Sequence, residues 1–216
     1  MRRPYGPLLL AMALGMLLLP MQGWAAGDGP ESSKQESAAA PARLFGSGKQ
    51  EIAIAVGYAI PLPVGNTTPE IDDLQYVFLA PRWGIGITNP LGGDAFYRGN
   101  FELLVEGQFF FETEPTSGWG GGFALLFRYN FLPEGKFIPF VEAGAGILGL
   151  DFDVAGQDDG FNFSPQAGLG FHYFLSENTA LTGEWRWLHI SNADTREPNF
   201  GIDSSLFLIG VSFFLE

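Results

Sequence analysis

The sequence has no cysteine among its 216 residues. Disulfide bridges and thiolate metal sites are therefore excluded. Basic residues are also scarce: 11 Lys and Arg stand against 24 Asp and Glu, which gives a formal net charge of −13. Nucleic-acid binding requires a basic face that complements phosphate, so we expect no nucleic-acid partner. The His, Asp and Glu residues show no metal-ligand spacing, and we expect neither a metal nor another cofactor.

Long hydrophobic runs are absent beyond the N-terminus. The first run, Leu8 to Leu19, follows Arg2 and Arg3 and precedes small residues up to Ala25. This pattern predicts a secretory signal peptide over residues 1–25. The run is shorter than the roughly 20 residues of a membrane-spanning helix, and no later segment reaches that length. We therefore expect no transmembrane helix in the mature chain.

The exported remainder is rich in glycine and phenylalanine, with 30 and 21 residues, and 46% of the whole sequence is hydrophobic. A cysteine-free, hydrophobic, exported chain of this kind indicates the outer membrane of a Gram-negative bacterium. Residues 26–44 contain almost no large apolar side chains and predict a disordered periplasmic lead-in. Residues 45–216 show no second linker and no internal repeat, so they predict one domain.

Within that domain, apolar and other residues alternate with a period of two, which is the signature of β-strands. The alternation predicts an all-β protein, an eight-stranded antiparallel transmembrane β-barrel in which closure leaves no strand edge unpaired. The predicted strands lie near residues 47–60, 74–88, 99–113, 120–131, 137–151, 161–174, 179–191 and 204–215. An N-terminus in the periplasm places the first, third, fifth and seventh connections outside the cell.

The inward face of the predicted barrel carries charges of both signs. A barrel of eight strands is filled by its own side chains, so these groups predict a packed, paired network rather than a pore. Paired carboxylates also occur in glycosidases, but this lumen leaves no room for a sugar chain. By parity, the inward polar residues are Arg82, Glu102, Glu106, Arg128, Glu142, Gln166, His172, Glu184 and Arg186.

The seventh predicted strand ends in an unusual polar group. Trp185 and Trp187 point outward by parity, and His189 and Ser191 continue the same face. Asp203 has outward parity at the external end of the next strand. Serine, histidine and an acid are the residue types of a nucleophile, a base and its orienting group. The competing interpretation is a structural barrel whose interfacial girdle contains these residues by accident.

The same stretch contains two motifs, HISNA at His189 to Ala193 and PNFGID at Pro198 to Asp203. Together they resemble the lipid A 3-O-deacylase (PagL) family of outer-membrane enzymes. FIPFVEAGAG at Phe137 to Gly146 and FSPQAGLGFHYFL at Phe163 to Leu175 are also similar to that family. The resemblance implies a small barrel that hydrolyses the ester-linked acyl chain at the 3 position of lipid A.

The resemblance also implies roles for the site residues. Ser191 would be the nucleophile, His189 the general base and Asn192 an oxyanion donor. The family usually has glutamate where this chain has Asp203, so the shorter acid is a departure from the pattern. Two loop residues are alternative acids: Asp194 and Glu197.

The predicted partners are lipid A or lipopolysaccharide and the surrounding outer-membrane lipid. The outward side chains expected to form the wall for the acyl chain are Trp185, Trp187, Phe207 and Ile209. Three alternatives remain open: a structural barrel, a barrel that binds lipopolysaccharide without cutting it, and an esterase for another lipid such as phospholipid. The sequence also leaves open whether the chain forms a homodimer.

Overall fold

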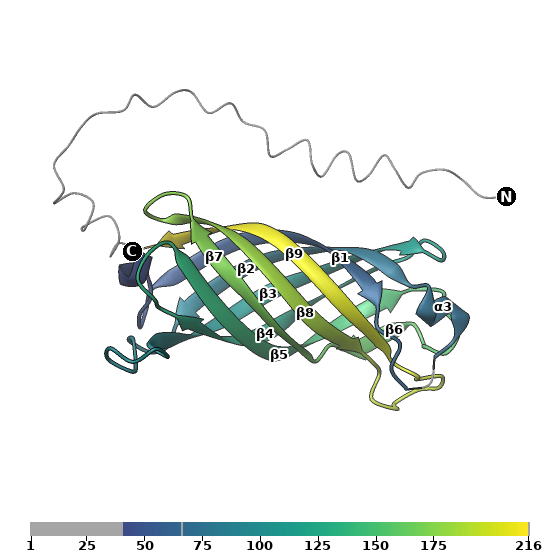
Figure 1. Ribbon diagram of the computed structural model, residues 1–216. Coiled ribbons are helices and arrows are strands. Elements are labelled where there is room, and N and C mark those ends of the chain that lie inside the picture. The colour runs from purple at the N-terminus through teal and green to yellow at the C-terminus, as the bar shows by residue number, and fades with distance from the viewer. Residues whose placement is uncertain (1–40, 66, 216) are drawn as a thin grey trace, which may run out of the picture.

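The computed structural model describes residues 41–65 and 67–215 (Figure 1). The predicted signal peptide lies outside the described residues. These residues include two short helices, the 3-10 helix η1 (Pro41–Leu44) and α3 (Pro69–Asp72). Most of the other described residues are in strands. The strands are β1 (Gln50–Pro61), β2 (Gln75–Gly86), β3 (Gly99–Glu114), β4 (Trp119–Phe131), β5 (Phe137–Asp151), β6 (Gly160–Phe163), β7 (Gln166–Phe174), β8 (Thr179–Ile190) and β9 (Ile202–Leu215).

The strands form one closed antiparallel barrel. Neighbours follow the order β4-β3-β2-β1-β9-β8-β7-β5-β6, and pairing of β4 with β5 closes the sheet. Both β6 and β7 pair with β5, so together they make the sixth strand of an eight-stranded barrel. The prediction of an eight-stranded barrel is confirmed. The predicted strand near 161–174 is divided because Pro165 has no N–H to donate to the ladder.

The two faces of the wall follow the predicted parity. In β9, Phe207, Ile209 and Phe213 are exposed, whereas the alternate residues Leu206 and Leu208 are buried. An apolar outer band of this kind is the surface that a barrel presents to lipid. Within residues 41–65 and 67–215, no helix is long and apolar enough to cross a membrane.

The barrel interior is a network of ion pairs. The Arg186 guanidinium donates to Glu106 at 2.7 Å, to Glu142 at 2.8 Å and to Glu184 at 2.6 Å. Arg128 donates to Glu142 at 3.0 Å. Breaking such buried pairs is costly, so the network opposes any change of strand register. All nine predicted inward residues are buried: Arg82, Glu102, Glu106, Arg128, Glu142, Gln166, His172, Glu184 and Arg186.

The barrel has two distinct ends in Figure 1. The C-terminal end is the one at which β1 begins and β9 ends. The opposite end, which carries α3, is called the loop end. Leu44 and Phe45 are buried at the C-terminal end, where the Phe45 ring packs 5.1 Å from that of Phe214. Because η1 packs into the barrel through Leu44, residues 41–44 belong to the barrel domain rather than to the predicted lead-in.

Candidate active site

The pairing of β8 with β9 sets His189 directly opposite Asp203 at the loop end. Both side chains are on the outer wall, and Nδ1 of the imidazole lies 3.1 Å from Oδ1 of the carboxylate. The His189 side chain is 27% exposed and the Asp203 side chain 11%. The imidazole thus remains accessible, while the acid behind it is mostly shielded from solvent. The aspartate therefore reaches the imidazole even though it is one methylene shorter than glutamate.

A third side chain joins this pair. The Trp187 indole Nε1 donates a hydrogen bond of 2.8 Å to Asp203 Oδ1, the oxygen that faces His189. The Trp187 ring also stacks on the His189 ring, with centroids 6.1 Å apart and planes inclined by 25°. Trp187 and His189 are two residues apart on one strand face, which is why the rings can stack. Sequence parity predicted Trp187 only as part of the wall for the acyl chain.

Ser191 follows the end of β8 on the same face as His189. Its backbone pairs with Phe163 of β6, with N···O distances of 3.1 Å and 2.8 Å. In the described part of the chain, no hydrogen bond joins the Ser191 hydroxyl to the imidazole. Catalytic hydrogen bonds are commonly loose in ligand-free enzymes and tighten when substrate binds. The structure therefore places serine, histidine and aspartate on one patch, with only the histidine–aspartate contact already formed.

Asn192 faces away from this patch, into the loop that follows β8. Its side chain is buried, and Nδ2 donates to the Arg196 carbonyl at 3.0 Å. Its backbone N–H donates to Asn199 Oδ1 at 2.9 Å. The next two residues, Ala193 and Asp194, have φ values of 54° and 56°, so the chain turns sharply just after the serine. Asn192 therefore shapes the turn that carries the nucleophile candidate.

The loop after β8 is tied to the neighbouring loop between β5 and β6. Arg196 Nε lies 2.8 Å from Asp158 Oδ2, and its Nη2 donates to the carbonyls of Asp159 and Phe161 at 2.9 Å each. The Gly201 N–H donates to Gln157 Oε1 at 3.1 Å. Several contacts across the two loops thus hold both sides of the patch in place.

Gly201 is a site residue that parity did not identify. It has a φ of +82°, and a Cβ at this position would lie 2.7 Å from Cε1 of the His189 ring. Glycine is therefore required for two reasons: the backbone has a positive φ, and a side chain would collide with the imidazole. The sequence feature that could have identified Gly201 is its position in PNFGID, two residues before Asp203. Phe163, the backbone partner of Ser191, was missed as well, because it belongs to a different strand.

The four residues predicted to form the acyl-chain wall lie on the outer face of the barrel. Trp185 pairs directly with Phe207, and Ile209 pairs with Gly183 on the same outer face. Trp185, Phe207 and Ile209 are exposed, and Trp187 is half-buried. The four side chains form a continuous apolar strip that runs from the patch toward the middle of the barrel.

The two alternative acids do not contact the imidazole. Asp194 Oδ1 accepts a hydrogen bond of 2.8 Å from Asn199, and Glu197 is exposed. Of the three candidate acids, Asp203 is therefore the one that contacts His189. Among residues 41–65 and 67–215, no group of three or more His, Cys, Asp or Glu residues could hold a metal ion.

Comparisons with known proteins identify the family and the fold. Fold and site together define an outer-membrane β-barrel with a polar patch on its lipid-facing wall. The family model for "Lipid A 3-O-deacylase (PagL)" matches residues 70–212, and the chain belongs to this family. A curated relative, lipid A deacylase PagL of Pseudomonas aeruginosa, is 33% identical over 89 residues. That match covers 39% of this chain and 49% of the relative, so it spans about half the relative's length.

Solved structures support the fold. The crystal structure of the outer membrane enzyme PagL matches with a TM-score of 0.53 and 20% identity, covering 74% of this chain and 97% of that one. Outer membrane protein OprG from Pseudomonas aeruginosa matches equally well, with a TM-score of 0.53 and 13% identity over 80% of this chain and 98% of that one. A likeness at these identities shows the barrel alone, so function has to be argued from the site.

Proposed function

We propose that this protein is a lipid A 3-O-deacylase that hydrolyses the ester-linked acyl chain at the 3 position of lipid A in the outer leaflet. The observation that carries the proposal is the His189–Asp203 pair beside Ser191 on a lipid-facing wall. Polar side chains are costly at a lipid-facing surface and commonly mark function. Membership of the PagL family supports the same substrate. The loop end would then face the cell exterior, where lipid A resides.

The first half of the reaction forms an acyl-enzyme. Asp203 accepts the Nδ1 hydrogen of His189, which leaves Nε2 free to act as the base. Nε2 takes the proton of the Ser191 hydroxyl while Oγ attacks the ester carbonyl. The tetrahedral intermediate collapses when the bond to the sugar oxygen breaks, and His189 returns the proton to that oxygen. The sugar leaves with a free hydroxyl and Ser191 retains the acyl group.

The second half releases the fatty acid. Water attacks the acyl-enzyme carbonyl as His189 accepts a proton from it, and collapse of the second intermediate restores the Ser191 hydroxyl. The sequence predicts Asn192 as the oxyanion donor, but its buried side chain faces away from the patch and its Nδ2 donates to the Arg196 carbonyl. We therefore assign to Asn192 the positioning of the turn that carries Ser191. The reaction as written requires no cofactor.

The acyl chain would lie on the apolar strip formed by Trp185, Trp187, Phe207 and Ile209. This strip starts beside the patch and descends toward the membrane core, so a chain lying on it brings its ester to the height of Ser191. The remaining acyl chains of the lipid stay in the leaflet. Substrate therefore reaches the site by lateral diffusion, without leaving the membrane.

The test is to incubate the folded protein with lipid A in detergent and to analyse the lipid by mass spectrometry. Ser191→Ala is compared with Ser205→Ala, a matched serine on the outward face of β9 opposite Trp187. We expect loss of one hydroxyacyl chain with the wild type and with Ser205→Ala, and an unchanged lipid with Ser191→Ala. Full activity in Ser191→Ala would refute the mechanism. Unchanged lipid A with folded wild type would instead favour a barrel that binds without cutting.

Phospholipid vesicles supply the second arm of the same experiment. The apolar strip would accept any acyl chain. Selectivity for lipid A over phospholipid must therefore come from contacts with the lipid headgroup. We expect no fatty acid release from phosphatidylethanolamine under conditions in which lipid A is cleaved. Equal rates on both lipids would assign the protein to the general outer-membrane lipid esterases.

A further inference from the structure

Asp203 Oδ1 receives two donors at once. The Trp187 indole N–H approaches to 2.8 Å and the His189 ring nitrogen to 3.1 Å. The indole contact is the shorter of the two. Because the carboxylate is only 11% exposed, few water molecules can replace either donor. The position of this oxygen therefore depends on Trp187 as well as on His189.

We infer that Trp187 is a positioning residue of the active site, which holds Asp203 and the imidazole in register for proton transfer. This inference rests on the proposed function. Trp187 contacts both members of the pair, the acid through its N–H and the base through ring stacking at 6.1 Å. An aspartate carboxylate turns about its side-chain bonds, and a second fixed donor restricts that rotation. The indole thus supplies the precision that a short acid at this position requires.

Trp185 provides a matched control on the same strand. It faces outward two residues earlier and pairs with Phe207 in the apolar strip. Within the described ranges, the Trp185 indole nitrogen makes no side-chain hydrogen bond of the kind that Trp187 makes to Asp203. The two tryptophans therefore distinguish acyl-chain contact from positioning of the acid. Trp185 would contact only the acyl chain, whereas Trp187 also donates a hydrogen bond to Asp203. Replacing either residue with phenylalanine keeps an aromatic ring on the wall and removes the N–H.

The test measures how fast a small fluorophosphonate modifies Ser191, which reports nucleophile activation without lipid A binding. We expect Trp187→Phe to react about tenfold more slowly than wild type, because hydrogen bonds to charged groups are worth about that factor or more. Trp83→Phe, which removes an indole N–H that donates to Gln50 at 3.0 Å on β2, away from the patch, is expected to react at the wild-type rate. With lipid A as substrate, Trp187→Phe and Trp185→Phe should raise KM by a similar small factor, because each makes one wall side chain smaller, and the fall in kcat should be specific to Trp187→Phe.

A double-mutant cycle with Asp203→Ala, which removes the acceptor of the indole N–H, identifies the route of the effect. If Trp187 acts through the Asp203 carboxylate, Trp187→Phe should cost little further activity once that carboxylate is removed. Multiplicative losses in the double variant would overturn the inference, as would an unchanged fluorophosphonate rate in Trp187→Phe. Wild-type protein that is folded but inert toward the reagent would instead refute the proposed function. Heat-modifiable gel mobility confirms that every variant forms the barrel.

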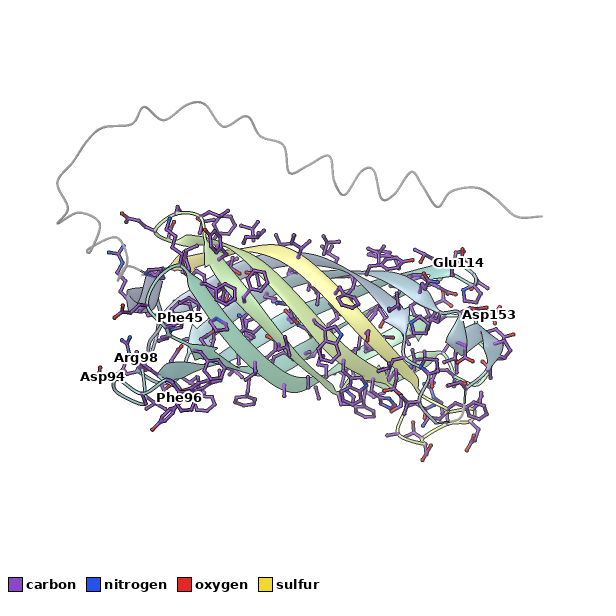
Figure 2. The ribbon with its side chains drawn as sticks, in the orientation of Figure 1. Phe45, Asp94, Phe96, Arg98, Glu114 and Asp153 are labelled. Carbon is purple, nitrogen blue, oxygen red and sulfur yellow. The ribbon has the colours of Figure 1, made fainter. Side chains whose placement is uncertain are left out.

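A second inference rests on a different part of the molecule, the connection between β2 and β3 over residues 87–98. This connection lies at the C-terminal end, where Figure 2 labels Phe96. Phe96 is 96% exposed and Tyr97 51%, and their rings meet edge to face at 5.3 Å. The outward-facing Tyr129 of β4 donates its hydroxyl to the Tyr97 carbonyl at 2.6 Å. The connection is therefore held against the lipid-facing wall.

We propose that Phe96 and Tyr97 anchor the barrel in the headgroup region of the inner, phospholipid leaflet. Aromatic side chains favour this region of a membrane. The pair is continuous with the apolar wall, because the Tyr129 ring that holds the connection packs 4.8 Å from Phe101 and 5.0 Å from Phe131. The charged neighbours Asp94 and Arg98 would remain at the aqueous boundary.

The absence of cysteine allows single-site labelling as the test. Phe96→Cys and Asp94→Cys each receive a nitroxide label, and the protein is reconstituted in phosphatidylcholine vesicles. We expect the label at residue 96 to be more accessible to oxygen than to a nickel chelate, with the reverse order at residue 94. Equal aqueous exposure of both labels would overturn the proposal. Shielding that disappears when protein is diluted with lipid would overturn it in favour of contact between copies of this chain.

Discussion

Gly201→Ala tests whether the position of the imidazole controls turnover. The new Cβ would lie 2.7 Å from His189 Cε1, whereas an ordinary contact begins at 3.4 Å. The ring must therefore shift by about 0.7 Å, or the loop must move by as much, and misplacements of about 1 Å are known to cost about 100-fold in rate. We expect a loss of about 10-fold to 100-fold in kcat.

The same substitution also strains the backbone, and this effect needs its own control. An alanine at φ +82° pays about 1–2 kcal/mol for the left-handed conformation. Gly135 has a φ of +100°, and a Cβ added there would meet no atom within 4 Å, so Gly135→Ala carries the strain without the collision. Gly135→Ala should lose about 1–2 kcal/mol of stability and keep its activity, whereas Gly201→Ala should lose at least as much stability and also lose activity.

The assay is release of the acyl chain from lipid A by mass spectrometry, with unfolding in urea followed by tryptophan fluorescence. A folded Gly201→Ala variant with wild-type kcat would refute the reasoning, because the imidazole would then tolerate displacement. Equal loss of activity in Gly135→Ala would also refute it, because backbone strain would then be sufficient.

Three further predictions concern the charged groups. Arg186→Ala should lower the free energy of unfolding by about 3–5 kcal/mol, measured in urea, because three buried carboxylates, Glu106, Glu142 and Glu184, each lose a charged donor. Asp203→Asn keeps an acceptor for Trp187 but removes the charge that stabilises the imidazolium, so kcat should fall by about 10²–10⁴-fold while KM is retained. Arg196→Gln removes the partly exposed ion pair with Asp158 and the hydrogen bonds to the Asp159 and Phe161 carbonyls, so stability should fall by about 1–2 kcal/mol. The freed loop should nevertheless be cleaved faster by a protease, and an unchanged cleavage rate would show that Arg196 does not fasten it.

The sequence by itself determined the barrel and the face on which the site lies. Side chains alternate across a strand with a period of two, so a local pattern is enough to assign His189 and Ser191 to the outer wall and Arg186 to the interior. The same alternation, repeated along the chain, predicted the eight strands. The break at Pro165 escaped this reasoning because the hydrophobic pattern continues on both sides of it.

The tertiary structure decided which of these residues touch. The contact of His189 with Asp203 depends on the register between β8 and β9, and a shift of two residues would preserve parity and abolish the contact. The indole bond of Trp187 depends on the same register. Gly201 meets the imidazole because the loop after β8 is fastened to a second loop near Gln157, 44 residues away in sequence. Such long-range contacts leave no local periodicity, and so they become visible only when the barrel is closed.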